Sequence, residues 1–206
     1  LTLVAALRYA RADASRIGFV GCGAQARAHL HVLRQAFPIT LVTAFSRSLA
    51  SAEALAAEAR AMGIEARVAM EAKAAVAGQD IVVTSVPGAP GGLEPFLSAE
   101  WLSPGSFAAL VDLGRSWKPD GFAGVEHRLV DDRAQAEASA AYRKLTPAGP
   151  YTADLLDLAR DSRPGRRSRE ERAVFTFQGL ALADLAVAAL AYDTAASVGI
   201  GMLLSA

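Results

Sequence analysis

The sequence predicts an α/β protein built on a doubly wound, Rossmann-type parallel sheet. Short apolar segments rich in β-branched residues alternate with alanine-rich segments of helical periodicity, which is the pattern of repeated strand–helix units. Residues 80–86 form a continuous apolar run that ends at Pro87, as expected of a parallel strand covered on both faces. A glycine-rich turn at Gly21 and Gly23 also joins an apolar segment directly to a helical one.

The first half of the chain alternates helices and strands in the order that this fold requires. We expect helices at 1–12, from the glycine turn to about Gln35, at 51–62 and at 71–77, and strands at 17–20, 39–45, 66–69 and 80–86. Ser51 is a candidate cap for the third helix, and Gly63 would end it.

The second half continues the alternation around a basic loop. We expect strands at 107–111, 128–130 and 174–177, and helices at 132–144, 151–160 and 180–196. The loop 163–172 holds five arginines and is interpreted as a solvated, flexible face. The long helix at 180–196 is too apolar for a lone surface element, so we expect it to pack against the first helix or a partner.

Composition narrows the class of protein. The 206 residues are 52% apolar and carry no formal net charge, which predicts a globular protein without a nucleic-acid partner. Its single cysteine and three histidines predict no disulfide and no metal site. Asp184 and Asp193 interrupt the apolar tract 179–206, so we expect no membrane span, and with no signal peptide visible we expect a cytoplasmic protein.

The glycine-rich turn predicts a nucleotide-binding site. Gly21 allows the tight turn, Gly23 lets the backbone approach a pyrophosphate, and Ala26 takes the third, small position of G-x-G-x-x-G/A. The free amides at the start of the following helix favour a phosphate. A glycine-rich turn with no ligand is the alternative.

The segment after the second predicted strand bears on the choice of cofactor. Dinucleotide folds that bind NAD place an acidic residue here, whereas this chain has Ser46, Arg47 and Ser48. Arg47 offers a fork of donors for phosphate oxygens, so NADP is favoured over NAD. An exposed turn arginine is the alternative.

Polar residues also end the fourth and fifth predicted strands, at the sheet edge where ligands bind in this fold. Thr84, Ser85 and Val86 close the fourth strand, and the hydroxyls could line the nicotinamide half of the cofactor. Asp112 follows the fifth strand and is the candidate catalytic residue, as a proton relay. A strand-end cap and a turn cap, respectively, are the alternatives.

Several blocks in order make the sequence resemble the ornithine cyclodeaminase/mu-crystallin family. The most specific are Gly-x-Gly-Ala-Gln-Ala at 21–26 and Gly-x-Ala-x-x-Asp at 179–184. The blocks lie at 18–26, 46–48, 80–84, 130–132 with Gln135, 175–184 and 199–201. The resemblance therefore spans nearly the whole chain.

The resemblance implies a domain that binds NAD(H) or NADP(H) and exchanges hydride at a carbon bearing an amine or imine. Its implied cofactor contacts are Gly21, Gly23, Ala24 and Gln25 for the pyrophosphate, Ser46, Arg47 and Ser48 for the 2′-phosphate, Thr84 and Ser85 for the ribose, and Gln178 and Gly179 for the nicotinamide. An oxidoreductase acting on amino or imino acids is favoured. An ornithine cyclodeaminase that recycles NAD, or a non-catalytic binding protein like mu-crystallin, stays open.

The same resemblance divides the chain into a Rossmann domain at 13–178 and two helical segments, 1–12 and 179–206, that belong to a second domain. Family members carry about a hundred further residues before this point, which build a homodimer and bind the substrate carboxylate through an arginine and a lysine. We therefore expect this chain to be a fragment that lacks this arginine and lysine and contains no residues that replace them. Asp112 matches the family's acid only approximately, which favours imine reduction over cyclodeamination.

Overall fold

The computed structural model describes residues 1–88, 92–143, 145–161 and 165–202 and confirms the predicted fold class. Eight parallel strands form one sheet in the order β3-β2-β1-β4-β5-β8-β6-β7. The strands are β1 (Arg16–Val20), β2 (Leu41–Phe45), β3 (Glu65–Val68), β4 (Ile81–Thr84), β5 (Phe107–Leu110), β6 (His127–Val130), β7 (Ala153–Asp154) and β8 (Ala173–Thr176). The winding direction reverses between β1 and β4, so the sheet has the switch point of a doubly wound fold.

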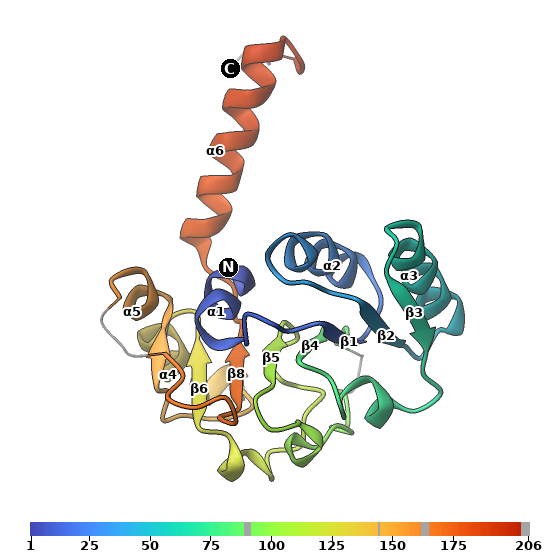
Figure 1. The fold of residues 1–206 in the computed structure, drawn as a ribbon. Coiled ribbons are helices and arrows are strands. Elements are labelled where there is room, and N and C mark those ends of the chain that lie inside the picture. Colours follow the sequence, from blue (N-terminus) through green and yellow to red (C-terminus); the bar gives the residue numbers. More distant parts are fainter. Residues whose placement is uncertain (89–91, 144, 162–164, 203–206) are drawn as a thin grey trace.

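Figure 1 shows helices around the sheet and a last helix that extends away from it. They are α1 (Thr2–Tyr9), α2 (Ala24–Ala36), α3 (Leu49–Ala61), α4 (Arg133–Arg143), α5 (Leu155–Ala159) and α6 (Ala181–Val198). Short 3-10 helices, η1 (Ala72–Ala75), η2 (Ala99–Trp101) and η3 (Phe122–Gly124), lie in the connections. The expected helix at 71–77 is thus a single 3-10 turn, and α5 is shorter than expected because β7 occupies the start of its segment.

Most strands divide their side chains between two large cores because successive residues of a strand point to opposite faces. A third, smaller cluster contains Val130 of β6, Ala136 and Leu145. Ile81 and Val83 of β4 enter the core under α1, α2 and α3, whereas Val82 enters the second core. That second core is built around Trp117, which is fully buried. The continuous apolar run at 80–86 is therefore explained by burial on both faces, as predicted.

α1 packs on the body of the domain. Its buried residues are Thr2, Ala5, Ala6 and Tyr9, and its neighbours are α2, α5, β5 and β8. The ring of Tyr9 lies 5.0 Å from the ring of His127. The first helix thus shares the core of the Rossmann sheet.

α6 extends away from the rest of the chain (Figure 1). None of its residues is buried, and Leu182, Leu190 and Tyr192 are each more than 60% exposed. Packing against α1, one of two expectations for this helix, is not observed. By length and composition alone, with mean hydropathy 1.4, α6 meets the requirements of a membrane-spanning helix, although Asp184 and Asp193 lie within it.

The described arginines of the basic loop contact other parts of the chain. Arg163 lies outside the described residues, but Arg166 donates to the carbonyl oxygens of Gly105 and Ser106 at 2.8 and 3.1 Å. The other arginines of the loop, Arg167, Arg169 and Arg172, contact Glu171, Asp13, and the carbonyl oxygens of Leu102 and Gly124. The interpretation as a solvated face holds for Arg167 and Arg169, whose side chains are 74% exposed, whereas Arg166 and Arg172 are half-buried against backbone carbonyl oxygens.

Candidate dinucleotide site

The glycine turn places a bare helix N-terminus at the carboxyl edge of the sheet. β1 ends at Val20, and α2 begins at Ala24 with Gly23 as its N-cap. No side chain caps this end, and the first turn, which includes the exposed Ala24 and Gln25, has no acidic residue. The first amides of a helix have no partner within it, so this end favours an anion.

The two glycines of the turn are there for different reasons. Gly21 has φ +86°, and a Cβ added to it would lie 2.7 Å from the carbonyl oxygen of Ser85. The fold itself therefore requires glycine at 21. Gly23 has φ −87°, and a Cβ added there would meet no atom within 4 Å. The open space beside Gly23 fits the close approach of a phosphate group.

Cys22, between these glycines, is a packing residue. It is 4% exposed, and its thiol donates to the carbonyl oxygen of Phe45 at 3.4 Å. Burial raises the pKa of this thiol to about 11. Because the thiolate is the nucleophilic form, the protonated Cys22 is unsuited to nucleophilic chemistry at neutral pH.

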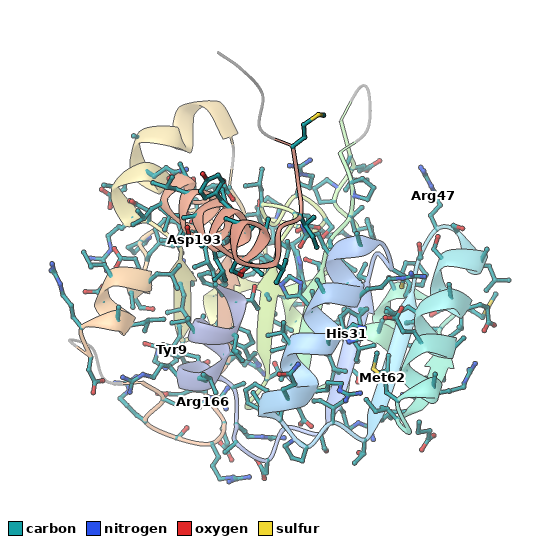
Figure 2. All side chains as sticks on the ribbon, turned by 90° about the horizontal axis from the view of Figure 1, so that it is seen from above. Tyr9, His31, Arg47, Met62, Arg166 and Asp193 are labelled. Carbon is teal, nitrogen blue, oxygen red and sulfur yellow. The ribbon has the colours of Figure 1, made fainter. Side chains whose placement is uncertain are left out.

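The segment after β2 leads into the N-terminus of α3. Ser48 is the N-cap residue, and its Oγ accepts a hydrogen bond from the amide of Ser51 at 3.4 Å. The prediction that Ser51 caps this helix is wrong, because α3 already begins at Leu49 and Ser51 lies in its first turn. Arg47 is exposed and points away from the body of the domain, as Figure 2 shows, and Ser46 is half-buried.

Thr84 and Ser85, at the end of β4, are tied to neighbouring strands. The Thr84 hydroxyl is fully buried, donates to Asp112 Oδ1 at 3.0 Å and accepts from the indole nitrogen of Trp117 at 3.1 Å. The Ser85 hydroxyl donates to the carbonyl oxygen of Gly21 at 3.1 Å. Thr84 thus faces the interior, whereas Ser85 braces the glycine turn.

Asp112 follows β5 and is 5% exposed. In addition to Thr84, its carboxylate accepts from the Ser116 hydroxyl at 2.6 Å and from the amides of Gly114 and Val86 at 3.1 and 3.4 Å. Both oxygens therefore serve as acceptors that join the ends of β4 and β5. The proton-relay role of Asp112 stays a prediction, and its geometry is that of a group that positions these two loops.

The residues after β8 are held by an acidic residue whose role the sequence did not reveal. Asp131, at the end of β6, is 2% exposed and accepts from the amides of Gln178 and Gly179 at 2.9 and 2.8 Å. Gln135 donates to the carbonyl oxygen of Gly179 at 3.2 Å. Asp131 and Gln135 belong to a block that carries the family resemblance, but only the fold brings them to 178–179.

A cavity of about 320 Å³ opens next to the glycine turn, between α1, α2 and the ends of β5 and β8. Val111, Phe177 and Leu33 supply apolar lining, and Gln25 and Asp184 supply polar lining. His29 also lines it, donates through Nδ1 to the Gln25 carbonyl oxygen at 2.7 Å, and accepts at Nε2 from the Thr2 hydroxyl at 2.9 Å. Burial lowers the pKa of His29, so the ring is neutral at neutral pH.

The sheet order gathers the predicted site along one edge. The glycine turn, 46–48, 84–86 and Asp112 follow β1, β2, β4 and β5, which are consecutive in the sheet, and 178–179 follow the next strand, β8. Because all these strands are parallel, the segments that follow them lie at the same edge. Metal ligands do not converge there: no cluster of three or more potential ligands occurs among the described residues.

This topology and glycine turn define a Rossmann-type domain of the class that binds dinucleotides at the switch point. The model of the ornithine cyclodeaminase/mu-crystallin family matches residues 2–199. The chain belongs to that family, as the sequence blocks indicated.

Characterised relatives are similar over most of the chain. Alanine dehydrogenase of Archaeoglobus fulgidus is 29% identical over 206 residues, covering 96% of this chain and 62% of the relative. Ketimine reductase mu-crystallin of Rattus norvegicus is 27% identical, covering 85% of this chain and 54% of the relative. A solved archaeal alanine dehydrogenase dimer with bound NAD superposes with TM-score 0.82 and 27% identity over 98% of this chain and 64% of that one. The chain thus spans less than two thirds of these relatives.

Proposed function

We propose that the protein is a dinucleotide-dependent oxidoreductase that transfers hydride to or from the carbon of an imine or amino acid. One observation carries the dinucleotide site: the N-terminus of α2 has no side-chain cap, and it is preceded by Gly23, where the fold would also accept a side chain. The names of the relatives, alanine dehydrogenase and ketimine reductase, support chemistry at a carbon–nitrogen bond.

NADP(H) is the proposed cofactor, with NAD(H) as the alternative. Arg47 directly precedes Ser48, the N-cap of α3, and the first amides of this helix add to the positive potential there. No carboxylate follows β2 to hold a ribose 2′-hydroxyl, since 46–48 read Ser-Arg-Ser. A 2′-phosphate at this point would meet a guanidinium and a helix N-terminus together. The similar solved dehydrogenase holds NAD, which has no 2′-phosphate, so the support for NADP(H) comes from the residues of this chain alone.

In the proposed site, the chain positions the reactants at the carboxyl edge. The first turn of α2 would bind the pyrophosphate, and Ser85 would keep the glycine turn in place through its bond to Gly21. Asp131 would fix Gln178 and Gly179 beside the nicotinamide. A bound reduced nicotinamide supplies the hydride for the imine carbon. Asp112 either relays the accompanying proton or, as its four hydrogen bonds favour, positions the loops around it.

We also propose that α6 packs against protein in a homodimer and that 179–206 belong to the expected second domain. The other segment expected in that domain, 1–12, contains α1, which packs on the sheet. The large exposed apolar side chains of α6 need a partner, and the similar solved dehydrogenase is a dimer. We propose that α6 is buried against another protein surface and not in a membrane. We also propose that the protein is cytoplasmic.

The cofactor proposal is tested by Arg47→Ala, with the exposed Arg34→Ala as control. Loss of charge-assisted hydrogen bonds to a 2′-phosphate should weaken NADPH binding by about 1.5–3 kcal/mol and leave NADH binding unchanged. Fluorescence titration with both cofactors measures this difference. Equal weakening of NADPH and NADH binding would contradict the 2′-phosphate contact.

The reaction is tested by following NADPH absorbance with a panel of cyclic imines and with oxo acids plus ammonia. Consumption of NADPH supports the oxidoreductase. Release of ammonia from ornithine with tightly held NAD supports the cyclodeaminase instead. Binding of NADPH without turnover of any of these compounds identifies a non-catalytic binding protein.

A further inference from the structure

Arg115 lies at the same sheet edge, in the loop after β5, and is not explained by the cofactor site. Its Nε donates to the backbone carbonyl oxygen of Asp112 at 2.9 Å. A Cβ added to Gly88 would lie 2.6 Å from Arg115 Nη1, so the guanidinium packs directly on the backbone of the loop after β4. The half-buried Arg115 side chain therefore bridges the loops that follow β4 and β5.

The loop that carries Arg115 contains two consecutive residues with left-handed backbone angles and two buried ones. Leu113 and Gly114 both have left-handed backbone angles, with φ +64° and +70°. The next two residues, Ser116 and Trp117, are fully buried, and the Trp117 amide donates to the Gly114 carbonyl oxygen at 2.9 Å. A non-glycine residue at positive φ persists where the surroundings determine the conformation, and such residues gather at ligand-binding sites.

The charge of Arg115 is not neutralised within the described part of the chain. No carboxylate among the described residues forms an ion pair with it, and its terminal nitrogens donate no hydrogen bond to those residues. The nearest acid in sequence, Asp112, already accepts four hydrogen bonds from other donors. A guanidinium held at Nε, whose terminal nitrogens have no acceptor among the described residues, matches a planar anion such as a carboxylate.

We propose that Arg115 binds the carboxylate of the amino or imino acid substrate, an inference that rests on the proposed function. The pyrophosphate is expected after β1 and the 2′-phosphate after β2. β5 is two strands from β1, or about 10 Å at the usual strand spacing. An anion beside Arg115 thus lies toward the reacting end of the dinucleotide. This chain therefore contributes its own carboxylate contact, whereas the sequence predicted none.

The test measures binding of a substrate-like carboxylate, so it does not depend on turnover. Pyrrole-2-carboxylate and its uncharged amide are titrated calorimetrically into the full-length protein saturated with NADP⁺. Arg115→Met should weaken binding of the carboxylate at least tenfold, leave binding of the amide unchanged, and leave the Kd of NADPH within twofold. Arg115→Lys should restore part of the affinity, and Arg34→Met, on the exposed last turn of α2, should match the wild type.

A second variant, Arg115→Gln, guards against a folding defect because its amide can still donate to the Asp112 carbonyl oxygen. It should lose carboxylate affinity as Arg115→Met does, with an unchanged melting temperature. Equal carboxylate affinity in wild type and both neutral variants overturns the inference, as does failure of the NADP⁺-saturated wild type to bind pyrrole-2-carboxylate. Failure of the wild type to bind NADPH, seen in a separate titration, overturns the proposed function instead.

Discussion

Replacement of Gly23 by alanine separates the requirements of the fold from those of the ligand. The backbone of Gly23 is extended, with φ −87° and ψ −159°, which alanine adopts without strain. No atom lies within 4 Å of the added Cβ. The folded protein should therefore tolerate Gly23→Ala, whereas a pyrophosphate in contact with the backbone should not.

Two small effects on stability oppose each other at this site. Alanine restricts the unfolded chain, which stabilises the fold by about 0.4–1 kcal/mol. Alanine is also a poorer N-cap than glycine, and the difference is on the order of 0.5–1 kcal/mol. The free energy of unfolding should thus change by less than about 1 kcal/mol. Displacing a phosphate from the helix amides should raise the Kd of NADPH at least tenfold, which corresponds to a loss of about 1.4 kcal/mol of binding free energy.

Gly21→Ala is the matched comparison, two residues away. A non-glycine residue at the φ of +86° found at position 21 loses about 1–2 kcal/mol of stability. The Cβ of the alanine would also lie only 2.7 Å from the Ser85 carbonyl oxygen. This variant should lose both stability and binding. Urea unfolding and NADPH fluorescence titration on both variants provide the two readouts. Wild-type NADPH affinity in Gly23→Ala would refute the close approach, and unfolding of that variant would show that the fold itself needs glycine at 23.

Two further predictions concern buried carboxylates. Asp112→Asn should lower the free energy of unfolding by about 1.5–3 kcal/mol, because an amide replaces an oxygen that accepts hydrogen bonds, and urea unfolding measures this. Wild-type stability with complete loss of imine reduction would instead support the proton relay. Hydrogen bonds from His127 and then from the Arg167 amide lower the pKa of Glu171 from 4.5 to about 2. Since this folded-state pKa is depressed, the stabilisation is complete above about pH 4.5 and is lost as the pH falls toward 2. Unfolding of Glu171→Gln from pH 7 to 3 should show a deficit relative to wild type that shrinks below pH 4.5, and a constant deficit would contradict the assignment.

The sequence by itself determined the local features of this protein. Strand and helix periodicity, the glycine turn and the run at 80–86 depend on neighbouring residues, so a single segment is enough to predict each of them. The family followed from blocks that keep their order along the chain, and the matched model confirms it. The predicted α/β class and the edge position of the site follow from these same local patterns.

Only the tertiary structure decided which distant groups meet. β8 inserts between β5 and β6, and this placement brings Asp131 to Gln178, 47 residues away in sequence. Three arginines of the basic loop, Arg166, Arg169 and Arg172, have partners because carbonyl oxygens and a carboxylate from other segments lie within reach. The sequence left Asp112 as a proton relay or a turn cap, because two of its donors, Thr84 at the end of β4 and Val86 just after it, come from a segment remote in the chain. Hydrogen-bond partners are set by the packing of strands that are remote in the chain, and no local pattern encodes that packing.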